Sequence, residues 1–161
     1  MIKSQGGKIM SINNIDSPIE QRNTAKGNPN AILIFDRPLN NRQQKLLDKL
    51  QEYDSSIVVS KKNVNMRDLS ALTAFTDDEF ALFTKGNKRL IIRGNSRGVN
   101  VGIMKANELS KNGFKWSGHT HPGIDFLSME ISEGDIAIWE CFNQDNVAIY
   151  NSKGEYRVYL K

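Results

Sequence analysis

Hydrophobic residues along the chain follow two spacings, and each spacing predicts one kind of element. Short apolar runs and alternating positions indicate strands, whereas apolar residues three or four positions apart indicate helices. Strands are expected at 31–35, 56–60, 80–84, 89–93, 114–121, 147–151 and 156–160, with a brief strand at 100–102. Helices are expected at 41–53, 66–75, 105–112 and within 131–142. This mixed order predicts an α/β (α+β) fold with a mixed central β-sheet flanked by helices.

The first 28 residues differ in composition from the rest of the 161-residue chain. They contain 8 apolar residues and no aromatic residue, and they are rich in Asn, Ser, Gly, Gln and Lys. Such a composition buries little surface. We therefore expect residues 1–28 to form a flexible arm or linker and residues 29–161 to form a single domain. No stretch approaches the roughly 18 apolar residues of a membrane span, and Met1 to Met10 lacks the apolar block of a signal peptide.

The charge pattern bears on the partners of the chain. The formal net charge is +4, and residues 1–28 account for half of it. A nucleic-acid-binding domain usually carries a concentrated basic stripe, but here Lys61-Lys62 and the group Lys85, Lys88 and Arg89 are short clusters that we interpret as solvated faces. Neither a nucleic acid nor a membrane is an expected partner. The single cysteine excludes an internal disulfide framework.

Two histidines are the most informative polar residues of the chain. His119 and His121 are its only histidines, and they precede Pro122 at the end of an expected strand. Residues i and i+2 of a strand project from the same face, so the two imidazoles would lie side by side and could ligate a divalent metal. A surface pair at a strand end is the alternative interpretation.

A second polar motif follows eleven residues after His121. Ser132 and Asp135 stand at the start of an expected helix, where a Ser-x-x-Asp pattern is close to an ordinary capping box. Alternatively, Asp135 turns toward the histidines as a third ligand. Two His and one carboxylate with an open fourth position form a catalytic zinc arrangement. Zinc lowers the pKa of a bound water to about 7.

The ordered set His119, His121, Pro122, Ser132 and Asp135 resembles the signature of the JAB/MPN (JAMM) zinc metalloproteases. That signature is an upstream Glu, then His-x-His-Pro, then Ser-x-x-Asp. The resemblance covers about residues 66–161. It implies a JAB/MPN (cytidine deaminase-like) core there, preceded by an N-terminal β-α-β extension in residues 29–65.

The resemblance also implies an activity, the zinc-dependent hydrolysis of an amide or isopeptide bond. His119, His121 and Asp135 would hold Zn²⁺. The upstream glutamate would be Glu79, by its order in the chain, and would act as general base and then general acid. Ser132 would hydrogen-bond the oxyanion. A surface carboxylate at the start of a strand is the alternative interpretation of Glu79.

One spacing departs from the family pattern. Ten residues separate His121 from Ser132, three more than family members usually have. At the usual spacing Met129 and Ser132 would take the places of the Ser and the Asp, and neither could replace the carboxylate. An insertion in the 123–129 loop accounts for the difference. Asp125 is the rival third ligand.

Several functional alternatives stay open at this point. The arm and the start of the domain resemble C-terminal modules of large bacterial secreted toxins. That resemblance implies delivery within a larger secreted protein and an immunity protein as a partner. The substrate would be a protein or peptide, including ubiquitin-like tails. A nuclease toxin using the histidine pair and a catalytically silent MPN-like binding module are the alternatives. Cys141 is interpreted as an inert thiol within the last helix.

Overall fold

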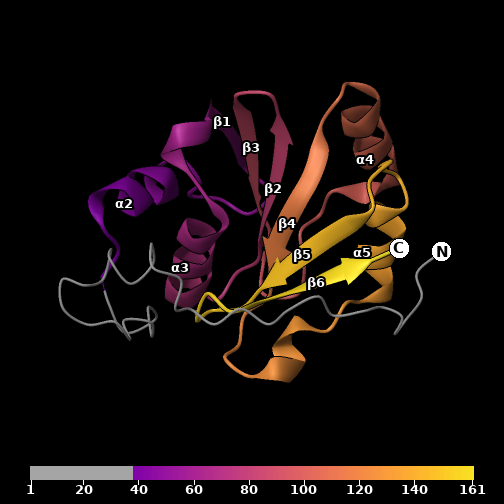
Figure 1. Cartoon of the computed structure of the whole chain (residues 1–161). Coiled ribbons are helices and arrows are strands. Elements are labelled where there is room, and N and C mark those ends of the chain that lie inside the picture. The colour runs from indigo at the N-terminus through magenta and orange to yellow at the C-terminus, as the bar shows by residue number, and fades with distance from the viewer. Residues whose placement is uncertain (1–37) are drawn as a thin grey trace.

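The computed structural model describes residues 38–161 and shows an α+β fold built on one mixed sheet (Figure 1). Its strands are β1 (Ser56–Ser60), β2 (Phe80–Lys85), β3 (Lys88–Arg93), β4 (Lys115–Thr120), β5 (Asn146–Tyr150) and β6 (Tyr156–Leu160). Its helices are α2 (Asn41–Asp48), α3 (Met66–Thr76), α4 (Gly102–Lys111) and α5 (Glu133–Trp139), with short 3₁₀ helices η2 (Lys61–Asn63) and η3 (Phe126–Met129). The expected arm at 1–28 and the expected strand at 31–35 lie outside the described residues.

The strand order of the sheet is β1-β3-β2-β4-β5-β6. All neighbouring pairs are antiparallel except β4 and β5, which run parallel. β1 pairs with β3 at one edge, so the described part of the expected extension lengthens the sheet. The expected α+β class with a mixed sheet is therefore confirmed for the described residues.

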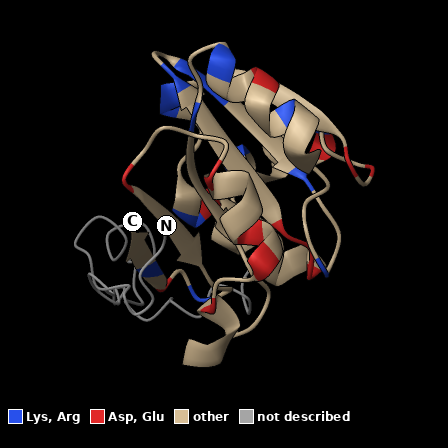
Figure 2. Ribbon diagram, turned by 90° about the vertical axis from the view of Figure 1, so that its right-hand side faces the viewer, with Lys and Arg blue, Asp and Glu red and all other residues tan. Residues whose placement is uncertain are grey.

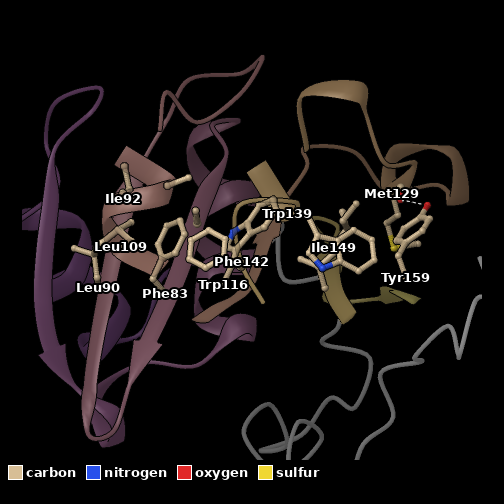
Figure 3. Packing of buried hydrophobic residues seen from close by; sticks show 13 residues of the cluster. Phe83, Leu90, Ile92, Leu109, Trp116, Met129, Trp139, Phe142, Ile149 and Tyr159 are labelled. Atoms are coloured by element: carbon tan, nitrogen blue, oxygen red, sulfur yellow. Dashed lines mark hydrogen bonds between the residues drawn. The ribbon is translucent and has the colours of Figure 1, made fainter. Parts of the chain in front are cut away.

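Both faces of the sheet are covered by helices, as the burial of alternating residues requires. On β2, Phe80 and Leu82 belong to the core beneath α2 and α3, whereas Ala81 and Phe83 belong to the core beneath α4 and α5. Figure 3 shows the second core, in which the rings of Phe83 and Trp116 stack at 6.2 Å between centroids. Each core removes apolar side chains from water, which is the main driving force for folding.

Two expected elements differ from the structure. The expected strand at 100–102 is wrong, because Gly102 begins α4 and residues 94–101 form a loop closed by a bridge between Asn95 and Gly98. The first described helix ends at Asp48, five residues before the expected end. Beyond it Leu50 turns into the core, and its carbonyl accepts a hydrogen bond from Arg93 Nη1 at 2.6 Å. The contact between Leu50 and Arg93 connects residues distant in sequence, so local periodicity does not contain it.

The two lysine clusters of the sequence meet at one end of the sheet. Ser60, next to Lys61, pairs with Lys88, and the Lys61 N–H donates to the Asn87 carbonyl at 2.9 Å. Figure 2 shows Lys and Arg gathered at the end of the molecule where β2 turns into β3. Among the described helices, none is long and apolar enough to cross a membrane.

Candidate metal centre

The two histidines lie at the end of β4. His119 is 2% exposed, and His121 follows the last residue of the strand. The His121 N–H donates to the Tyr150 carbonyl at 2.9 Å, which continues the parallel pairing with β5 by one residue. The two Nε2 atoms are 3.0 Å apart. The prediction that both imidazoles share one face is therefore confirmed.

A β-bulge positions the tryptophan beneath this pair. Leu82 pairs with Gly118, but Phe83 pairs with Trp116, so Ser117 has no partner in the β2–β4 register. An extra residue in one strand changes the face to which the preceding side chains point. As a result Trp116 stacks on His119 at 4.8 Å between ring centroids, although the two residues are three positions apart.

Asp135 joins the histidines from the first turn of α5. Its Oδ1 lies 3.0 Å from His119 Nε2, and its Oδ2 lies 3.2 Å from His121 Nε2. The same side chain completes a capping box, because Asp135 Oδ2 accepts from the Ser132 N–H while Ser132 Oγ accepts from the Asp135 N–H. The capping-box and ligand interpretations are therefore compatible. The cap holds the carboxylate in the orientation that faces the imidazoles.

Glu79 reaches the same place from the start of β2. Its Oε2 lies 4.0 Å from His121 Nε2, and candidate ligand atoms of Glu79, His119 and His121 all lie within 4.8 Å of one another. The interpretation of Glu79 as a surface carboxylate is wrong, since the residue is 8% exposed. Its backbone is held by the 94–98 loop: the Glu79 N–H donates to Asn95 O, and the Gly94 N–H donates to Glu79 O.

An ion pair that no sequence motif indicates anchors Asp78, the residue before Glu79. Arg93 donates to Asp78 Oδ2 through Nη2 at 2.8 Å and through Nε at 3.0 Å. Both side chains are largely buried, and the rings of Tyr53 and Phe80 lie 5.8 Å from the guanidinium. This anchor restrains the backbone that carries Glu79. Within the acidic run Asp77-Asp78-Glu79, Asp78 therefore pairs with an arginine, whereas Glu79 faces the histidines.

The long 122–131 segment is a structured part of the site. His121 Nδ1 donates to the Ser128 carbonyl at 2.9 Å, which leaves the Nε2 lone pair of a neutral imidazole for a metal. Met129 is 1% exposed and belongs to the core, so it cannot take the place of the site serine. Asp125 is exposed, and its carboxylate caps η3 by accepting from the Ser128 N–H. The structure therefore brings Asp135, and not Asp125, to the histidines.

Burial and neighbouring charges determine the protonation of the cluster. Burial raises the pKa of Glu79 from 4.5 to about 7, with a further increase from Asp135 and an opposing effect from His121. Burial lowers the pKa of His119, and Asp135 opposes only part of this effect. Burial alone would also lower the pKa of His121, but the Asp135 hydrogen bond and the Glu79 charge outweigh it and raise that pKa.

Asp135 is the charged acceptor of this cluster. Burial alone would raise its pKa, but the adjacent imidazoles outweigh burial and hold the pKa of Asp135 well below its usual range. The group is therefore a carboxylate at neutral pH. His119 Nδ1 and Trp116 Nε1 are both buried, and neither has a hydrogen-bond partner among the described residues.

The cluster opens into a cleft of about 440 Å³. The cleft is bounded by the 97–101 loop, the start of α4 and the first turns of α5, and Ser132 also lines it. Arg97 and Gly98, at the end of the turn that follows β3, contribute to the lining. Gly94 permits the close turn, since a Cβ there would lie 2.1 Å from the Gly98 carbonyl oxygen.

The donor set fits a divalent metal ion. Two imidazole nitrogens and one carboxylate are the ligands of many catalytic zinc sites. In a tetrahedral site with bonds of about 2.0–2.2 Å, ligand atoms lie roughly 3.3–3.5 Å apart. Asp135 Oδ1 lies 3.0 Å from His119 Nε2, and the two Nε2 atoms are also 3.0 Å apart, which is slightly shorter than that spacing. The two histidines, with Glu79 or Asp135 beside them, could therefore bind a metal ion.

Cys141 does not take part in this cluster. It follows the end of α5, and its thiol is directed to the Ala137 carbonyl at 3.5 Å. Burial raises the pKa of the thiol, with a contribution from Glu140, which is the opposite of what an activated nucleophile needs.

Comparisons with models of protein families, with curated proteins and with solved structures found no match to this chain. The function is therefore inferred from the geometry and chemistry of the site.

Proposed function

We propose that the chain is a zinc-dependent peptidase or isopeptidase of the JAB/MPN type, with its core in residues 66–161. The observation that carries the proposal is the meeting of His119, His121 and Asp135 with a buried glutamate in one cleft. These groups come from three separate segments of the chain, and each is held by its own backbone or side-chain hydrogen bonds.

His119, His121 and Asp135 would hold the metal. Zinc bound by these groups would lower the pKa of a water molecule toward about 7 and so supply hydroxide at neutral pH. The Ser128 carbonyl orients the His121 ring through Nδ1, and the Ser132 cap orients the Asp135 carboxylate. Such outer contacts keep ligand atoms in place before a metal arrives.

Glu79 would carry protons during the reaction. Its carboxyl group lies in the cleft with a pKa near neutrality because of its burial, so both protonation states are accessible near pH 7. A general base that later acts as an acid needs this property. A bound cation would shift the balance toward the carboxylate. Glu79 would thus accept a proton from the attacking water and deliver it to the leaving amine.

Ser132 would stabilise the developing negative charge on the substrate carbonyl oxygen. Its Oγ accepts from the Asp135 N–H at 3.0 Å, and its hydroxyl proton is left to donate into the cleft. A donor that is oriented before the reaction stabilises an oxyanion more than water does. A protein or peptide chain is the substrate class that this arrangement serves.

The metal site is tested by elemental analysis of purified protein after dialysis against zinc. About one zinc ion per chain is expected in the unaltered protein and in Asp125→Asn, and a large loss is expected in Asp135→Asn. Both substitutions keep the shape of the side chain and leave one oxygen that can accept the capping hydrogen bond. An unaltered chain that takes up no zinc would overturn the proposal.

The proposed activity is tested on the zinc-loaded protein with a mixture of cellular peptides analysed by mass spectrometry. New peptide ends are expected with the unaltered chain. They should be lost in Glu79→Gln while the zinc content stays the same. Cleavage that continues in Glu79→Gln at the original rate would overturn the assigned role of this glutamate.

A further inference from the structure

We infer that the cleft beside the histidines receives an aliphatic side chain of the substrate, next to the amide bond that is hydrolysed. The inference rests on the proposed function and names the substrate class of the same site. It would make the protein selective for peptide bonds flanked by Leu, Ile, Val or Met.

The first observation is the chemistry of the cleft wall. Glu79, His119, His121 and Asp135 line one cleft together with a set of apolar side chains. These side chains come from the 97–101 loop, the first turn of α4 and the last turn of α5. They are Val99, Val101, Ile103, Ala137 and Ile138. A substrate whose amide bond reaches the cluster must therefore place a neighbouring group against aliphatic surface.

The second observation is that this wall retains apolar surface in contact with solvent. Ile103 lines the cleft and is 49% exposed. Covering such surface with a substrate side chain is favourable by roughly 25 cal/mol per Å² removed from water. The cleft volume of about 440 Å³ also lies within the roughly 300–1,000 Å³ range of small-molecule sites.

The third observation is the charge at the cleft. Arg97 carries the only positive charge among the lining residues other than the histidines, and its guanidinium has no carboxylate partner among the described residues. Arg97 and Asn100 are both exposed and can stay hydrated, whereas the aliphatic part of the lining has no hydrogen-bonding side-chain atom. A charged or amide side chain placed against that part would lose its water without gaining a partner, so an uncharged aliphatic side chain fits it best.

The fourth observation is that the wall is already ordered. Asn95 Oδ1 accepts from the N–H groups of Arg97 and Gly98 at 2.8 and 3.2 Å. The Val101 N–H donates to the Val99 carbonyl at 2.9 Å, and both valines pack against the core. A preformed pocket loses little entropy when it is filled, which favours selectivity.

The test uses zinc-loaded protein and two metal-binding probes, N-acetyl-leucine hydroxamate and N-acetylglycine hydroxamate. Both carry the same chelating group, and they differ in the aliphatic side chain alone. Isothermal titration calorimetry is expected to show at least roughly tenfold tighter binding of the leucine compound. Equal affinities for the two probes would overturn the inference and leave the proposed metal site intact.

Two adjacent residues of α4 provide the variant and its control. Ile103→Asn places a polar group in the cleft and should abolish most of the preference for the leucine probe. Met104→Asn alters the next residue, which is 85% exposed and does not line the cleft, and should leave the preference unchanged. Circular dichroism and zinc content verify that both variants are folded.

The outcomes separate the two proposals. A preference that persists in Ile103→Asn would overturn the assignment of the aliphatic wall, although zinc and both probes still bind. A protein that binds neither zinc nor either hydroxamate would instead overturn the proposed function, and the inference with it.

Discussion

Replacing Glu79 by Gln in the metal-free protein should stabilise the fold above pH 7 and have little effect near pH 4.5. The substitution keeps the size of the side chain and removes its ability to ionise. Burial raises the pKa of Glu79 from 4.5 to about 7 in the folded state. Between these two values the folded chain binds more protons at this residue than the unfolded chain does. Stability contributed by Glu79 is therefore complete below pH 4.5 and is lost as the pH rises through 7.

The size of the effect follows from the width of that window. A separation of about 2.5 pKa units corresponds to about 3 kcal/mol, because one unit is about 1.4 kcal/mol. The Glu79 side chain is 10% exposed, so solvent screens little of this cost. Glu79→Gln should therefore exceed the unaltered chain in unfolding free energy by up to about 3 kcal/mol at pH 8.

The assay is urea unfolding at several pH values between 4.5 and 8, with a chelator present so that no metal contributes. Glu52→Gln, at an exposed position, supplies the baseline for losing one carboxyl group. The stability difference between Glu79→Gln and the unaltered chain should grow as the pH rises. A difference that stays constant over this range, or that grows toward acid, would refute the reasoning that burial governs this carboxyl group.

Two further predictions concern the support of the site. Arg93→Met should lower the unfolding free energy in urea by about 3 kcal/mol, because it leaves the buried Asp78 carboxylate unpaired. Its control, Arg42→Met, removes the 43% exposed ion-pair partner of Asp68 and should lower it by about 1 kcal/mol or less. Equal losses of stability in the two variants would contradict this view. Gly118→Ala should cost about 1–3 kcal/mol and weaken zinc uptake, because its Cβ would lie 3.0 Å from a β5 carbonyl oxygen. Gly98→Ala is the control, because a Cβ at Gly98 would have no atom within 4 Å. An equal loss of stability in Gly98→Ala would contradict the packing argument.

Local features of the site were predictable because they depend on a few neighbouring residues. The period-two rule placed His119 and His121 on one face, and their Nε2 atoms are 3.0 Å apart. The Ser-x-x-Asp pattern predicted the cap at Ser132, and the cap is present in full. In both cases the backbone geometry of a single strand or helix determines how close the two side chains lie.

Features that depend on strand order were not predictable in this way. The choice between Asp125 and Asp135 required knowing that the first turn of α5 brings Asp135 to the end of β4, whereas the Asp125 carboxylate is used to cap η3. The burial of Glu79 and the anchor between Asp78 and Arg93 likewise depend on contacts with the 94–98 loop and β3.

The sequence by itself determined most of the helices and strands and the side-by-side histidines, since hydrophobic spacing and capping act within about one turn or one strand. The motif order already indicated Glu79 and Asp135, but only the tertiary structure decided between Asp135 and its rival Asp125. It alone also decided that β1 lengthens the sheet and that the lysine clusters share one end. The physical reason is that these contacts connect residues distant in sequence. Their distances follow from the order in which strands pair and from the faces that helices cover, and no local pattern contains that information.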